Sequence, residues 1–344
     1  MTLPISDGAV VITSISGPNA VLQSIAAGSL THRVPFFVIG DSKSPEGFSL
    51  KGCDYYSVAR QRTLPYAFAK ICPERTYARK NIGYLAAMAA GARFIVETDD
   101  DNFPREEFWE GRNPSVAAHC ISAPGWLNAY HYFSDSPIYP RGLPLEYVRP
   151  PGHVFPDRKE ISSHHCAIQQ GLADSNPDVD AIYRMLFPLP LDFRRDEPLV
   201  LASGTWCPFN SQNTTTFREA FPLLYLPTYC SFRMTDIWRS FVAQRIGWTC
   251  GWTISFHNAT VYQERNEHNL LRDFADEVPG YLNNAKIAES FNSLDLAPGE
   301  ANIEANMRRC YQCLIDLKLV DPRENDLLDA WFADLKQLGS VRPS

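Results

Sequence analysis

The stretch that most constrains this chain is Arg93-Phe-Ile-Val-Glu-Thr-Asp-Asp-Asp-Asn102, which predicts a short apolar strand ending in three consecutive carboxylates. We call Asp99, Asp100 and Asp101 the acidic triplet. Adjacent like charges repel, so a folded chain tolerates them best when a cation or several donors lie among them. Alternate side chains of an extended chain share a face, which pairs Asp99 with Asp101. Such an oxygen-rich pair suits Mg²⁺ or Mn²⁺. A solvated acidic turn is the alternative.

The composition indicates a globular protein. The 344 residues suffice for one large domain or two modest ones, and a 45% hydrophobic share with 12% aromatics is ample for a packed core. A net charge of -7 without a basic run argues against nucleic acid or an anionic membrane as the main partner. We expect no membrane span and no signal peptide. Nine scattered cysteines are typical of a reduced protein, so we expect a cytoplasmic location.

The first hundred residues alternate between strand-like and helical runs. Expected strands cover 9–13, 34–40, 54–58 and 93–98, and expected helices cover 18–27, ended by Gly28, and 77–91. This alternation predicts a βαβ series with a parallel sheet. Ligands bind such sheets outside the carboxyl ends of the strands. Loop 14–19, Asp41 and the acidic triplet would share that edge.

The rest of the chain has a different pattern. Residues 103–200 are rich in Pro, Gly and aromatics, so long helices are not expected there; 178–183 fits either a strand or a short helix entry. A strand at 199–202 leads into a polar loop over 203–216. An amphipathic helix is expected over 236–246, with Thr235 as N-cap and Gly247 as its stop. The apolar spacing beyond residue 280 is helical.

Several short motifs carry a resemblance to a known family. Ala78-Arg-Lys-Asn-Ile-Gly-Tyr84 precedes Asp99-Asp-Asp-Asn102, and further motifs follow in order. The chain resembles the STELLO family of plant Golgi glycosyltransferases over roughly residues 8–265, with the C-terminal tail outside the likeness. We expect no counterpart of the membrane anchor of the plant proteins, so a Golgi location is not expected to carry over. The further motifs are Tyr139–Leu145, Val179–Ile182, Ser211–Thr214, Leu224–Pro227 and Phe232–Arg239.

The resemblance implies the GT-A glycosyltransferase fold, a Rossmann-like, mostly parallel sheet with flanking helices that ends in a DxD-type metal motif. It also implies a distant likeness to the reversibly glycosylated UDP-arabinopyranose mutases. We expect a GT-A domain over 1–280, with a nucleotide-binding half at 8–102 and a sugar and acceptor half at 103–280. Residues 281–344 would form a C-terminal helical cap.

The resemblance also implies a nucleotide and metal site. We expect Mn²⁺ or Mg²⁺ at Asp99 and Asp101, with His257 as a third ligand, although a structural histidine is the alternative. For Thr13 to Ile15 the alternative is an ordinary strand end and turn, and for Asp41 it is a turn residue. For Arg79 and Lys80 the alternative is a solvated helix face. The predicted nucleotide-binding residues are Thr13, Ser14, Ile15, Asp41, Arg79, Lys80, Asn81, Asp99 and Asp100.

Four further residues are candidates for the sugar and acceptor half. Asp236 is expected to contact the acceptor hydroxyl and, if the enzyme inverts, to take its proton; a helix dipole would favour a carboxylate there in any case. Asp180 lies in a family motif and could approach the donor sugar. Gln212 and Asn213 would line the sugar pocket, unless their amides satisfy the local backbone.

These features predict a metal-dependent glycosyltransferase that uses a nucleotide-diphosphate sugar, most simply a UDP-sugar, and a glycan or small-molecule acceptor. Departure of the diphosphate builds negative charge, which a divalent ion stabilises. A nucleotide-sugar mutase and a non-catalytic nucleotide-sugar-binding or assembly protein are the alternatives. Phosphate hydrolysis is disfavoured, because one short acidic cluster does not obviously hold two metals.

Overall fold

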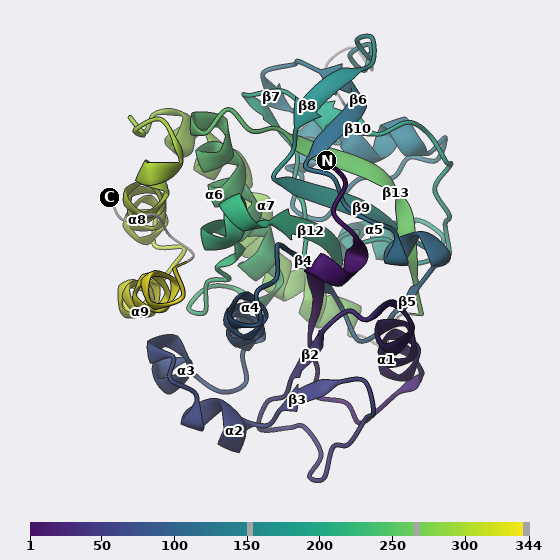
Figure 1. The fold of residues 1–344 in the computed structure, drawn as a ribbon. Coiled ribbons are helices and arrows are strands. Elements are labelled where there is room, and N and C mark those ends of the chain that lie inside the picture. Colours follow the sequence, from purple (N-terminus) through teal and green to yellow (C-terminus); the bar gives the residue numbers. More distant parts are fainter. Residues whose placement is uncertain (150–153, 265–268, 340–344) are drawn as a thin grey trace.

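One large sheet organises the chain (Figure 1). The structure, a computed structural model, describes residues 1–149, 154–264 and 269–339. Within them, β5 (Asn102–Pro104) pairs with β13, and the other strands of the sheet follow one path. Their order is β3 (Asp54–Tyr56), β2 (Phe36–Ile39), β1 (Gly8–Thr13), β4 (Phe94–Thr98), β12 (Asn213–Phe217), β9 (Ile168–Asp174), β13 (Ile254–Gln263), β10 (Leu199–Leu201), β6 (Ser115–Ile121) and β8 (Ser162–His165).

The sheet is parallel in the first half of the chain and mixed beyond it. β3, β2, β1 and β4 are all parallel neighbours. β12 then pairs antiparallel with both β4 and β9, and β13 pairs parallel with β9. A separate pair joins β7 (Gly125–Trp126) to β11 (Thr205–Trp206). The expected α/β class, with a Rossmann-like parallel series and flanking helices, is confirmed.

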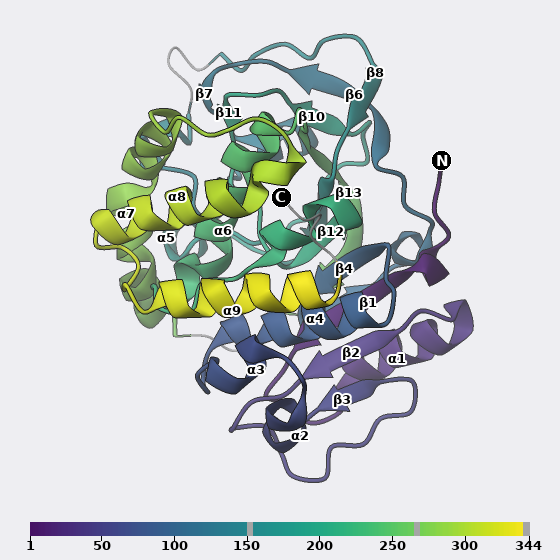
Figure 2. The same cartoon turned by 60° about the vertical axis from the view of Figure 1, so that its left-hand side comes forward.

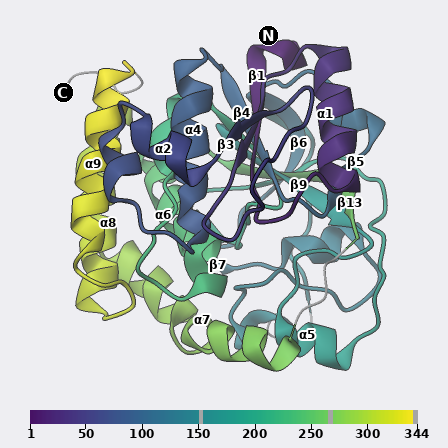
Figure 3. The same ribbon diagram turned by 90° about the horizontal axis from the view of Figure 1, so that it is seen from below.

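Helices cover both faces of the sheet. Seen from below in Figure 3, α1 lies on one side of the sheet and α4 and α6 on the other, with α8 and α9 outermost. Side chains of β1 alternate accordingly, because Val11 joins the core under α4 while Val10 joins the core under α1. The helices are α1 (Ala20–His32), α2 (Val58–Thr63), α3 (Ala67–Ile71), α4 (Lys80–Ala89), α5 (Ala181–Leu186), α6 (Thr235–Thr249), α7 (Leu270–Asn292), α8 (Ile303–Asp316) and α9 (Glu324–Gln337).

Two predicted helices have different boundaries in the structure. α1 starts after the N-cap Asn19, continues through Gly28 and ends at His32, and its C-cap Arg33 takes a left-handed conformation (φ 58°). Gly28 is needed for packing inside the helix, because a Cβ there would lie 2.1 Å from the ring of Trp109. α6 likewise passes through Gly247 and ends at Thr249, and Thr235 is its first residue rather than its N-cap.

The polar loop predicted over 203–216 contains a central strand. β12 is buried at every residue and pairs with strands on both sides. Its threonines are β-branched and fit a pleated sheet, and polar neighbours satisfy them, as when Thr214 Oγ1 donates to the carbonyl of Asn210 (2.6 Å). The other open prediction, at 178–183, resolves as the entry to α5, with Asp180 as N-cap.

The C-terminal helices pack directly on the sheet domain. Figure 2 shows α8 and α9 lying across it, with α9 beside α3. The Asp334 carboxylate accepts the N–H groups of Ala67 and Phe68 at the start of α3 (2.7 and 2.8 Å). The buried Glu324 carboxylate accepts the N–H groups of Thr228 and Tyr229. None of the helices in the described residues is long and apolar enough to cross a membrane.

Candidate functional site

The acidic triplet lies directly after β4, at the carboxyl edge that β1, β2 and β4 share, and its three residues are half-buried. The hydroxyl of Ser14, which follows β1, donates to Asp100 Oδ2. Asn19 donates to the Asp100 carbonyl (2.8 Å). On the far side, Gln263 at the end of β13 donates to Asp101 Oδ1 (3.0 Å). Segments far apart in sequence therefore meet at the triplet.

Asp99 is held by the start of the α4 segment. Its Oδ1 accepts from the Tyr77 hydroxyl (2.8 Å), in the 3-10 turn η2 (Tyr77–Arg79), and from Lys80 Nζ (3.3 Å). Lys80 is fully buried and also donates to the carbonyls of Thr98 and Ser211. The sequence therefore places one buried cation beside the triplet.

The electrostatics of this edge favour an added cation. Desolvation raises the pKa of Asp99 to about 7; Lys80 acts to lower that pKa, whereas the nearby Asp101 raises it further. The Asp99 side chain is still 29% exposed. Carboxylates at a half-buried edge match the oxygen ligands that Mg²⁺ and Mn²⁺ take. Asp99 and Asp101 therefore fit a divalent ion that draws its other ligands from substrate and water.

His257 is not brought to this site. His257 lies on β13, where it pairs with Gly171 of β9. It precedes Gln263 by six residues, a separation on the order of 20 Å along a strand. Its Nδ1 contacts the carbonyl of Asn258 (3.0 Å). Among the described residues, no group of three or more His, Cys, Asp and Glu side chains could hold a metal. The structure thus places His257 apart from Asp99 and Asp101, with a backbone partner of its own.

The predicted residues at the ends of β1 and β2 do lie at this edge. Thr13 Oγ1 donates to the carbonyl of Ile39 (3.0 Å), and Ile15 is 53% exposed. Asp41 bridges two loops by accepting the N–H groups of Ser42 (2.6 Å) and Thr76 (3.1 Å). These contacts shape the loops beside the triplet.

Two neighbours of Lys80 point elsewhere. Arg79 is 1% exposed; its guanidinium donates to the side chain of Gln61 (2.8 Å) and to the carbonyl of Pro73 (3.0 Å). Asn81 is fully buried and pairs with both backbone groups of Leu226 (2.9 Å each). Both side chains are used in packing, which argues against the predicted nucleotide contacts.

Asp236 belongs to a second charged group, the Arg141 cluster, which consists of Arg141, Asp178 and Asp236. Arg141 Nη2 lies 2.8 Å from Asp178 Oδ2 and 2.9 Å from Asp236 Oδ2, and all three side chains are buried. Burial alone would raise the pKa of Asp236, but Arg141 lowers it to about 2. Asp236 also accepts from the N–H and hydroxyl of Ser211. A carboxylate so strongly paired is a poor proton acceptor, so the predicted general-base role is not supported.

The other three candidates are also buried. Asp180 caps α5 by accepting the N–H of Tyr183 (2.7 Å) and the hydroxyl of Tyr139 (3.1 Å), and burial raises its pKa to about 6. Asn213 lies inside the sheet, where its amide donates to the carbonyl of Leu172 (2.7 Å). Gln212 donates to the carbonyl of Asn176 (3.2 Å). Asp180 and Asn213 are thus engaged by groups of the protein itself.

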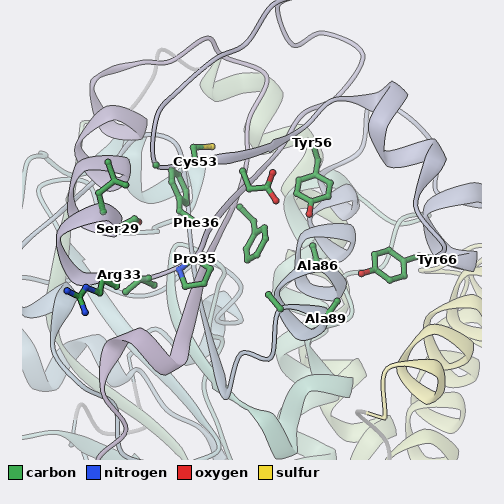
Figure 4. A pocket seen from close by; sticks show the side chains of 15 residues that line it. Ser29, Arg33, Pro35, Phe36, Cys53, Tyr56, Tyr66, Ala86 and Ala89 are labelled. Atoms are coloured by element: carbon green, nitrogen blue, oxygen red, sulfur yellow. The ribbon is translucent and has the colours of Figure 1, made fainter.

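A hollow of about 840 Å³ opens at the opposite edge of the sheet (Figure 4). It lies between the ends of α1 and α4 and the beginnings of β2 and β3, with Arg33, Tyr56, Tyr66 and Ala89 in its lining. The lining contains none of the predicted site residues. We therefore place the candidate site at the triplet, where carboxylates and polar side chains are grouped, and not at this hollow.

Sequence reasoning missed several residues that build the site. Tyr77, Ser211 and Gln263 contact the triplet or its partners. Tyr77 and Ser211 lie in or beside motifs used for the resemblance, so their position was a usable signal. Arg141 lies in the Tyr139–Leu145 motif, where its buried ion pairs could not be foreseen. Gln263 lies in none of those motifs and carried no signal.

Comparison with known proteins gives consistent results. The family described as STELLO glycosyltransferases matches residues 233–344. The protein named "Probable glycosyltransferase STELLO2" from Arabidopsis thaliana is 28% identical over 333 residues, covering 89% of this chain and 42% of that protein. "Probable glycosyltransferase STELLO1" from the same plant is 30% identical over 246 residues, covering 65% and 32%. The chain thus spans less than half the length of either relative.

The family match corrects one expectation. The resemblance was expected to end near residue 265 and to leave out the tail, but the matched region contains α7, α8 and α9. Glu324, near the end of the match, accepts the N–H groups of Thr228 and Tyr229, which lie just before its start. The C-terminal helices therefore lie within the matched region and also pack on the sheet domain.

Proposed function

We propose that this chain, which belongs to the STELLO glycosyltransferase family, transfers a sugar from a nucleotide-diphosphate sugar to an acceptor, with UDP as the nucleotide. The observation that supports this most is the half-buried acidic triplet at the carboxyl edge of a Rossmann-like series, held by donors from β1, α4 and β13. Ligands of such sheets bind at this edge.

Asp99 and Asp101 would hold Mn²⁺ or Mg²⁺, which when bound offsets the negative charge on the departing diphosphate. The chain's own residues prepare that site. Lys80 and Tyr77 fix the orientation of Asp99, and Ser14 fixes Asp100. The loops after β1 and β2 would receive the base and ribose, with Ile15 as an exposed apolar contact. Positioning of this kind, before the substrate arrives, lowers the cost of organising the transition state.

The proposal is tested by incubating the protein with UDP-sugars and Mn²⁺ and following UDP release by NMR, first without an acceptor and then with candidate glycans. We expect release that depends on the metal and rises with an acceptor. Isomerised UDP-sugar without an acceptor would identify a mutase instead. Binding of UDP with Mn²⁺ but no turnover of any UDP-sugar would favour the non-catalytic alternative. A matched variant, Asp99→Asn, should lose turnover while keeping its fold.

A further inference from the structure

We propose that Phe232 forms the floor of an acceptor subsite that takes the C–H face of a pyranose ring, so that the acceptor is a saccharide. This inference rests on the proposed function and names its acceptor class. Phe232 lies in the 3-10 turn η8 (Phe232–Met234), immediately before α6, and is 59% exposed.

The first observation is that the turn around Phe232 is fixed. The Ser231 hydroxyl donates to the carbonyl of Asp276 on α7. Arg233 Nη2 pairs with the buried Glu277 at 2.9 Å, and Met234 is 1% exposed. Three of the four residues in this segment are therefore anchored on α7, and Phe232 alone faces outward. Exposure of a single large apolar side chain is common in itself, but here it is imposed by a rigid segment.

The second observation is the position of the ring relative to the acidic triplet. Phe232 packs against Tyr77 with the ring centroids 6.4 Å apart and the planes at 80°. The Tyr77 hydroxyl contacts Asp99 Oδ1 (2.8 Å) and Ser211 Oγ (2.7 Å). One aromatic ring thus separates Phe232 from the carboxylate proposed to serve the diphosphate.

The third observation is that the triplet has exposed apolar residues on two sides. Ile15 follows Ser14, whose hydroxyl contacts Asp100, and so lies on the side of β1. Phe232 reaches the triplet through Tyr77, from the segment that leads into α6. With the nucleotide on the β1 side, Phe232 lies on the side from which an acceptor would approach.

The chemistry of the ring decides the class of ligand. The face of an aromatic ring carries partial negative charge and attracts groups with a positive edge. The axial C–H groups of a pyranose form such an edge, while its hydroxyls remain available to polar neighbours. The carboxylates and amides near the triplet would suit those hydroxyls. A purely apolar acceptor would displace water from the half-exposed carboxylates without replacing its hydrogen bonds.

The test is binding of the labelled protein to an array of immobilised hexose oligosaccharides, with and without UDP and Mn²⁺. We expect the wild type to bind at least one saccharide class and Phe232→Ala to weaken that binding about tenfold. Phe232→Trp should retain it, because a larger ring preserves the platform. Leu282→Ala is the matched control, because Leu282 on α7 is 74% exposed and should not affect binding.

UDP affinity, measured on the same proteins, separates the two proposals. Unchanged UDP affinity in Phe232→Ala together with lost saccharide binding supports the subsite. Saccharide binding that is equal in Phe232→Ala and wild type overturns it, as does a wild type that binds UDP with Mn²⁺ and no saccharide. Absence of metal-dependent UDP binding would contradict the proposed function, while the array without nucleotide would still report on Phe232.

Discussion

The acidic triplet and the Arg141 cluster are two carboxylate groups joined by one residue, and they differ in how they are neutralised. Ser211 contacts Asp236 with its N–H and contacts Tyr77, the partner of Asp99, with its hydroxyl. In the Arg141 cluster a buried guanidinium pairs with both carboxylates. At the triplet, Lys80 pairs with Asp99, and all three carboxylates are only half-buried.

The difference indicates that the Arg141 cluster serves the stability of the fold and that the triplet serves binding. A buried carboxylate with a full set of donors stabilises the fold and has little capacity left for a ligand. Carboxylates at an edge that stays partly exposed can be reached by an added cation. Substitutions in the Arg141 cluster should therefore change stability, and substitutions in the triplet should change binding.

The largest effect is expected for Arg141→Met. Removing the guanidinium leaves Asp178 and Asp236 buried without their cation, so the free energy of unfolding should fall by about 3–5 kcal/mol. Urea denaturation at pH 7 measures this. The control is Arg62→Ala, whose exposed pair with Glu74 should contribute no more than about 1 kcal/mol. Similar small losses in both variants would show that the Arg141 cluster is not a stabilising unit.

Asp180→Asn sharpens the comparison, because Asp180 is buried and one of its oxygens, Oδ2, has no hydrogen-bond partner among the described residues. Its pKa is raised from 3.8 to about 6, so the folded state loses stability as pH rises from about 4 to about 6. Asparagine retains an N-cap oxygen without the charge. The variant should be more stable than wild type at pH 7, by up to about 3 kcal/mol, and this gain should vanish near pH 4. A gain that does not depend on pH would exclude the charge as its cause.

Ser14→Ala should have the smallest effect. It removes one hydroxyl that orients Asp100, and a single hydrogen bond of this kind contributes about 1 kcal/mol. We expect metal-dependent UDP affinity to fall about fivefold in calorimetry, with unfolding free energy within about 1 kcal/mol of wild type. A loss of stability without a change in affinity would assign Ser14 to the fold alone.

The sequence was sufficient for the parallel half of the sheet and for the edge at which the acidic triplet lies. Parallel strands buried on both faces are continuous apolar runs, as in Ala9–Thr13, and the triplet follows such a run directly. The edge at which Ser14, Asp41 and the triplet meet follows from strand order alone. Lys80 was placed correctly because α4 leads into β4.

Tertiary contacts decided what the sequence could not. β12 reads as a loop because its threonines are polar, and only its neighbours in the sheet bury and satisfy them. Gly28 reads as a helix stop because its packing partner, Trp109, is distant in sequence. Asp236 reads as a base because Arg141, which neutralises it, is 95 residues away. Polar residues such as Asp236 were predicted to contact ligands, whereas in the structure their partners are other residues of the protein.

The central claim is that the acidic triplet binds a nucleotide diphosphate through a divalent ion, and calorimetry of UDP with Asp101→Asn tests it most directly. The account predicts that wild-type protein binds UDP only with Mn²⁺ present and that the variant loses at least about a hundredfold in affinity. Its unfolding free energy should stay within about 1 kcal/mol of wild type, because asparagine keeps a side-chain oxygen that can accept from Gln263. Equal binding of UDP and Mn²⁺ by Asp101→Asn and wild type would contradict the account.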